Sequence, residues 1–150
     1  MWDKFKRALG YFWASPVTVV GLIYTGTFNL FRWYKWHGLE GDALVWTVSE
    51  GAPGWLKRAW SGWGGHAIGN VVVLTKTPLA GDSTLTHEQK HVNQCMRLGI
   101  FQPIFYGLSL LFIKIGCTDS DPYYDNPFEI DARRHTGELI DVVGAMKPKK

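Results

Sequence analysis

The sequence predicts an α+β fold in which hydrophobic helices come first, a small antiparallel sheet follows, and three further helices complete the domain. Three observations lead to this class. Residues 8–31 form an uncharged run, residues 37–76 contain short β-prone runs separated by glycines, and helix-forming patterns begin after residue 82. The 150 residues are the length of one domain with a single core of moderate size.

The composition is that of a globular chain with an excess of aromatic residues. Hydrophobic residues make up 46% of the sequence, which is ordinary, but 15% is aromatic and eight residues are Trp. Such an excess indicates an interface or a membrane boundary. The net charge of +3 is mild and the cations form no long stripe, so we expect no nucleic-acid partner. Cys95 and Cys117 are too few for a disulfide framework, and their redox state stays open.

The first segment has the outline of a helix that spans a membrane or lies on one. No charged residue occurs from Ala8 to Phe31, and Lys, Arg and aromatic residues crowd both ends of this run. Pro16 is expected to kink or start a helix. The alternative is therefore an amphipathic helix at 1–13 that packs on the domain, followed by a second, buried helix. A later uncharged stretch, residues 98–113, is short for a span and is predicted to be a buried core helix.

The middle of the chain predicts a small antiparallel sheet or hairpin. Turn signals surround β-prone runs at 43–48 and 67–74, and residues 55–60 fit a short helical turn. We expect residues 70–74 to be a strand that can lie at an exposed edge. Residues 75–82 then form a loop.

The helix after this loop carries the main functional motif. Asp82, Ser83 and Thr84 are candidate N-caps, and Gly99 is a good C-cap residue. Between them, residues 87–91 read His-Glu-Gln-Lys-His, which matches HExxH. Residues at i and i+4 share one helix face, so both imidazoles can reach a single Zn²⁺.

Glu88 lies one position along from the first of these histidines. From there it can act as general base and take the proton of a zinc-bound water. The alternative is a solvated helix surface that carries two His and a Glu–Lys pair.

A catalytic zinc needs a third protein ligand. The candidates are His37, His66, His135 and the carboxylates of residues 121–132. Asn126 followed by Pro127 marks a helix start, which puts Glu129 in the first turn. Asn126 and Glu129 also fit a capping box, which needs no metal, so both interpretations stay open. Asp131 is a reserve oxygen ligand or a partner that orients a His.

These residues together resemble a known family. The pattern His87-Glu88-x-x-His91-x-x-Gln94, then Gly99, an apolar helix and Tyr-x-x-Asn-Pro-Phe-Glu-x-x-Ala is similar to that of minimal gluzincin-type zinc metallopeptidases of bacteria and phages. The similarity covers about residues 65–135. It implies that His87 and His91 bind zinc, that Glu88 is the base, and that Glu129 is the third ligand.

The same resemblance suggests supporting roles for further residues. Gln94 would pack beside the site or support a ligand. Tyr123 or Tyr124 would stabilise the oxyanion, or alternatively pack against the motif helix. His66 would line the cleft or be structural. Gln89 and Lys90 depart from the apolar residues common at these positions, which suggests a partly exposed helix or a shallow site.

The resulting expectation is a zinc-dependent peptidase that acts on a peptide or protein substrate, and for which no oligomeric state is predicted. The domain plan is a hydrophobic, membrane-associated segment at 1–36, a zincin-like domain at 37–146 and a basic tail at 147–150. The alternative is a membrane-associated or virion structural protein whose zinc site only braces the fold. A structural site of that kind would have four protein ligands.

Overall fold

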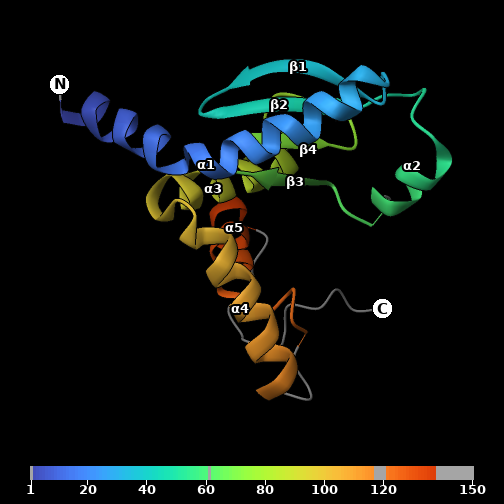
Figure 1. Cartoon of the computed structure of the whole chain (residues 1–150). Coiled ribbons are helices and arrows are strands. Elements are labelled where there is room, and N and C mark those ends of the chain that lie inside the picture. Colours follow the sequence, from blue (N-terminus) through green and yellow to red (C-terminus); the bar gives the residue numbers. More distant parts are fainter. Residues whose placement is uncertain (1, 61, 117–120, 138–150) are drawn as a thin grey trace.

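The computed structural model describes residues 2–60, 62–116 and 121–137, and these contain helices and strands in the order shown in Figure 1. The predicted tail at 147–150 and Cys117 lie outside the described residues. In chain order the elements are α1 (Trp2–Leu30), β1 (Tyr34–Glu40), β2 (Ala43–Val48), α2 (Gly54–Trp60), β3 (Gly65–Ile68), β4 (Val71–Leu74), α3 (Ser83–Leu98), α4 (Phe101–Gly116) and α5 (Pro127–Thr136). The α+β class is confirmed. The predicted boundary between residues 36 and 37 falls inside β1.

The four strands form one mixed sheet in the order β1-β2-β4-β3. β1 with β2 and β3 with β4 are antiparallel, whereas β2 and β4 are parallel. The prediction of an antiparallel sheet is therefore wrong for the central pair, because α2 and β3 intervene and bring the chain back beside β2 in the same direction. The predicted strand 67–74 is a hairpin, since Gly69 adopts a left-handed φ of 64° at its turn. β4 is thus interior and β3 lies at the edge.

The core lies on both faces of this sheet. On one face α3 covers the inward side chains of β2 and β4, and this cluster consists of Ala43, Val45, Val72, Leu74, Leu85 and Val92. On the other face the end of α1 and the short helix α2 pack on the sheet around Tyr34, Leu56 and Val73. The alternation of Val72 and Val73 between the two clusters follows from the two-residue period of a strand.

α1 is a single long helix that passes through Pro16, so of the two alternatives the one with two N-terminal helices is wrong. Proline removes the N–H that would have bonded to the carbonyl four residues earlier. That carbonyl belongs to Phe12, and it accepts a hydrogen bond from Ser15 Oγ at 2.7 Å instead. α1 is long and apolar enough to cross a membrane, a property that it shares with core helices and signal sequences.

Close backbone contacts hold α1 against the β3–β4 hairpin. A Cβ on Gly21 would lie 2.6 Å from the carbonyl oxygen of Ile68, so only glycine fits this crossing. Next to it, Thr18 Oγ1 accepts a hydrogen bond from the backbone N–H of Asn70 at 3.0 Å. The hairpin turn and the helix therefore fix each other's position.

α4 differs from the buried core helix that the sequence predicted. α3 and α4 are bent by 113° at the break after Leu98, and α4 then runs away from the sheet (Figure 1). None of its residues is buried. The apolar composition led to the wrong expectation, because a hydrophobic helix stays exposed when the fold offers it neighbours on one side only.

Candidate metal centre

α3 presents two neighbouring rows of side chains to the rest of the protein. Asp82 caps the helix, with its Oδ1 accepting from the N–H groups of Thr84 and Leu85 at 2.8 and 3.1 Å. Leu85, Glu88 and Val92 follow at i, i+3 and i+7 and are buried against the sheet. Glu88 is thus a carboxylate within an apolar row, which explains its burial.

The adjacent row of α3 faces α5 and contains His87, His91 and Gln94. Asn126 Oδ1 caps α5 by accepting from the N–H of Phe128 at 3.0 Å, and Pro127 occupies the first helical position. Glu129 in the first turn is 3% exposed and points at the two histidines. Its carboxylate makes no capping-box bond, because the N–H of Asn126 bonds to the carbonyl of Tyr123.

Among the described residues, His87, His91 and Glu129 form a group that can hold a metal ion. The two Nε2 atoms lie 3.2 Å apart, and they lie 3.2 and 3.3 Å from the two oxygens of Glu129. A tetrahedral ion with bonds of about 2.0–2.1 Å needs ligand atoms about 3.3–3.4 Å apart, which matches these separations.

The unsatisfied atoms of the group support the same interpretation. Oε2 of Glu129 is buried and lies 3.2 Å from His87 Nε2 and 3.5 Å from Arg133, but neither contact has hydrogen-bond geometry. Imidazole nitrogen and carboxylate oxygen are donors that suit divalent transition-metal ions. A cation between them would satisfy all three side chains.

A chain of hydrogen bonds sets the tautomer of His91. Gln94 Nε2 donates to Asp131 Oδ2 at 2.9 Å and to the carbonyl of Phe128 at 3.0 Å, so its Oε1 must face His91. This oxygen lies 2.8 Å from His91 Nδ1, which must therefore carry the proton. His91 Nε2 keeps its lone pair directed at the metal position.

Two further side chains hold Glu129 in place. Tyr106 of α4 donates its hydroxyl proton to Glu129 Oε1 at 2.8 Å, and Arg133 lies one turn along α5 from the same carboxylate. Tyr106 was not predicted from the sequence. It stands in an apolar run, 23 residues from its partner, and no local signal marks it.

The two acids of the site have opposite electrostatic environments. Burial alone would raise the pKa of Glu129, but its contacts with His87, His91 and Tyr106 outweigh burial and hold that pKa well below its usual value. Burial raises the pKa of Glu88 to about 7, only partly opposed by the two histidines. Glu88 Oε2 has no hydrogen-bond partner. Glu129 is therefore ionised in the folded protein, whereas Glu88 can gain or lose a proton near neutral pH.

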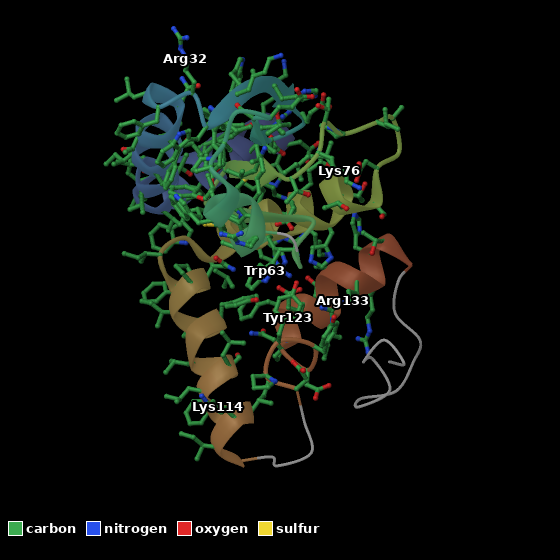
Figure 2. The ribbon with its side chains drawn as sticks, turned by 90° about the vertical axis from the view of Figure 1, so that its right-hand side faces the viewer. Arg32, Trp63, Lys76, Lys114, Tyr123 and Arg133 are labelled. Carbon is green, nitrogen blue, oxygen red and sulfur yellow. The ribbon has the colours of Figure 1, made fainter. Side chains whose placement is uncertain are left out.

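A cavity of about 240 Å³ opens beside these groups. It is lined by Trp63, Gly65, His66, Ala67, Glu88, His91, Gln102, Pro103, Tyr106, Gly107, Tyr123 and Glu129, which come from β3, α3, α4, α5 and the segments just before β3 and α5. The rings of Trp63 and Tyr123, which are labelled in Figure 2, lie 5.6 Å apart at one wall. A substrate in this cavity would meet the poised acid and the metal position together.

The remaining predicted residues fall into three places. Tyr123 lines the cavity, whereas the ring of Tyr124 lies 4.3 Å from the guanidinium of Arg133. His66 also lines the cavity, and its ring stacks 4.1 Å from that of Trp60. Asp131 lies outside the ligand group and binds Gln94 and Lys90.

The polar residues inside the motif have partners of their own. Gln89 Nε2 donates to the carbonyl of Glu40 at 3.0 Å, and Lys90 lies 3.3 Å from Asp131. α3 is accordingly half-buried at these positions, while Glu88 and Glu129 are buried. The helix is partly exposed as expected, but its ligand face is covered.

Comparison with known proteins gives no match to this chain among family models, curated proteins or solved structures.

Proposed function

We propose that this protein is a zinc-dependent metallopeptidase that hydrolyses peptide bonds. The observation that carries the proposal is the convergence of two imidazoles and one carboxylate beside a second, buried carboxylate, one oxygen of which has no hydrogen-bond partner. Two His and one Glu are a ligand set of catalytic zinc, and a base next to them is the other component that hydrolysis requires.

The roles of the residues follow from their positions. A zinc ion in such a site polarises the scissile carbonyl and lowers the pKa of water. Glu88 takes the proton from the attacking water and delivers it to the leaving amine. Tyr106 and Gln94 hold Glu129 and His91 in the orientation that the metal needs. Tyr123 at the cavity wall is our candidate for stabilising the oxyanion.

The edge strand β3 is suited to hold an extended peptide. It pairs with β4 on one side only among the described strands, and Gly65, His66 and Ala67 line the cavity. Backbone pairing at such an edge binds a peptide without demanding a particular sequence. The sequence suggested residues 70–74 as the peptide-binding edge strand, and we now propose residues 65–68 for this role.

The second candidate is a membrane-associated structural protein that uses the metal only to brace its fold. The exposed apolar α1 favours it. A bracing zinc would have four protein ligands, whereas the ligand group in the described part of the chain has three. His135, a candidate fourth ligand, is exposed. A group of three ligands among the described residues favours the peptidase.

The test combines metal content with activity in two variants. Elemental analysis of protein purified without chelator should find one zinc per chain in the wild type, and Glu129→Ala should lose it. Glu88→Gln should keep the zinc and lose at least a hundredfold in hydrolysis rate on a mixed peptide library, because it removes only the base. Glu50→Gln, the same change at an exposed residue, is the control.

Two results would contradict the proposal. Equal zinc content in wild type and Glu129→Ala would show that Glu129 is not the third ligand. Undiminished hydrolysis by Glu88→Gln would show that Glu88 is not the base. A wild type that holds zinc firmly and hydrolyses no peptide would support the structural candidate.

A further inference from the structure

The outward face of α1 is more apolar than the face that packs on the protein. The inward row contains small residues at helical spacing, namely Gly10, Ala14, Val17, Gly21 and Thr25. The outward residues include Phe5, Leu9, Phe12, Val20 and Ile23, which are all more than half exposed. A helix of a water-soluble protein has the opposite arrangement, with its large apolar side chains inward.

α4 carries a second exposed apolar row. Its large exposed side chains are Phe101, Ile104, Phe105, Leu108, Leu111, Phe112 and Ile115, and their spacing of three and four residues places them on one face. Gln102 and Tyr106 project from the other face into the metal cavity. α4 therefore separates the cavity from an apolar exterior.

The two rows form one continuous surface, which we call the α1–α4 face. The rings of Trp13 and Phe101 lie 6.4 Å apart where the helices meet, and Gly99 makes room there for Trp13. Figure 2 shows α1 (blue) and α4 (gold) along the same side of the molecule, with Trp63 and Tyr123 beyond α4. Soluble monomers rarely expose apolar patches larger than about 600 Å². The α1–α4 face instead carries large, exposed apolar side chains along two helices.

The charges around the α1–α4 face lie at its margins. No charged residue occurs between Ala8 and Phe31. Three cations (Lys4, Lys6, Arg7) and one acid (Asp3) precede this run, and Arg32 and Lys35 follow it. The single charged residue of α4 is Lys114, in its last turn, which Figure 2 places at the far end of the molecule from Arg32. Cations and aromatic rings around an uncharged middle match an anionic lipid surface, where headgroups meet the margin and acyl chains meet the centre.

We propose that the α1–α4 face rests on an anionic lipid bilayer, with both helices parallel to the membrane plane. A spanning α1 would carry the sheet into the hydrocarbon, because the helix is packed on the β3–β4 hairpin through Gly21, and open sheet edges are not tolerated there. α4 is about 24 Å long, less than the roughly 30 Å of a hydrocarbon core. This inference does not depend on the metal site.

Flotation with vesicles tests the proposal. Wild-type protein should float with vesicles of equal parts phosphatidylglycerol and phosphatidylcholine, and less with phosphatidylcholine alone. The double variant Ile23→Glu/Phe112→Glu should lose at least tenfold in partitioning, because it puts two charges among acyl chains. The control Leu39→Glu/Leu79→Glu also places two charges at exposed apolar positions, here at leucines outside both helices that are at least as exposed, and should bind as wild type.

Other outcomes would overturn the proposal. Wild-type protein that stays in the aqueous fraction, or an equal loss in both variants, would exclude a lipid surface at this face. A dimer that the Ile23→Glu/Phe112→Glu variant dissociates, without vesicle binding by either protein, would identify a second copy as the partner. Protein that resists extraction by alkaline carbonate would indicate a spanning helix instead. Unchanged circular dichroism and metal content in the variants would exclude unfolding as the cause.

Discussion

The imidazole of His91 shows how the chain directs a single atom. A neutral histidine has two tautomers, and only one leaves Nε2 free to bind a metal. Here the choice is made by Gln94, whose amide is itself oriented by Asp131 and the carbonyl of Phe128. α3 and α5 thus contribute jointly to the state of one ring nitrogen.

Replacing Gln94 tests this arrangement. Gln94→Leu removes the acceptor for His91 Nδ1, and we expect zinc affinity to fall by about 10–100-fold, as measured by competition with a chromophoric chelator. Asn93→Leu, the same kind of change at the exposed neighbouring position, should bind zinc as wild type does. If Gln94→Leu keeps wild-type affinity, the hydrogen-bond chain has no role in metal binding.

The predictability of the site depended on how local each signal was. His87, Glu88 and His91 lie within one helical turn or so, and their spacing alone pointed to a shared metal. Glu129 was found with a capping alternative still open, because one side chain in a first turn can serve either purpose. Tyr106 could not be found, since its contact with Glu129 depends on the angle between α3 and α4.

At the scale of elements, two glycines of α1 have different surroundings, and only one of them lies at a close contact. Gly21 lies against Ile68 and Val71 of the hairpin, whereas nothing lies within 4 Å of a Cβ on Gly26. The two glycines are five residues apart in the same helix. A substitution at Gly21 therefore tests packing, and the same substitution at Gly26 tests helix propensity.

Alanine at these two sites should therefore change stability in opposite directions. Gly21→Ala would push the helix off the hairpin and should lower the free energy of unfolding by about 1–3 kcal/mol. Gly26→Ala should raise it by about 0.5–1 kcal/mol, because alanine loses less backbone entropy in a helix. Urea denaturation followed by circular dichroism measures both. Equal shifts in the two variants would mean that the crossing at Gly21 is not tight.

Elements with clear end signals were predicted well, and the others were not. As expected, Asp82 and Gly99 cap the two ends of α3, and Asn126 caps the start of α5, because capping is a local interaction. Pro16 led to the incorrect alternative of a helix break. The sequence pattern does not show that Ser15 donates to the Phe12 carbonyl, a hydrogen bond that replaces the one proline cannot make. The exposure of α4 was also hidden, because apolar composition does not say what lies next to a helix.

At the scale of the whole molecule, His66 links stability to pH. Burial lowers its pKa from 6.5 to about 4, so the folded protein keeps this ring neutral where the unfolded chain would protonate it. The stability that His66 contributes is complete above pH 6.5. It is lost as the pH falls toward 4, and the full loss is about 3 kcal/mol.

A substitution isolates this contribution. His66→Phe keeps an aromatic ring beside Trp60 but cannot take up a proton, so its unfolding free energy should fall less than that of the wild type between pH 6.5 and 4. Both proteins are measured with chelator present, which removes metal release from the comparison. Parallel pH profiles would show that His66 is not the group responsible.

The bend after Leu98 gives α4 the properties of a lever. The helix is fixed near Gly99, its apolar row extends outward from that pivot, and Tyr106 on the opposite side grips the acid that completes the metal triad. Any force that tilts the far arm must also shift that hydroxyl. A contact on the far arm of α4 is therefore transmitted to the carboxylate of Glu129.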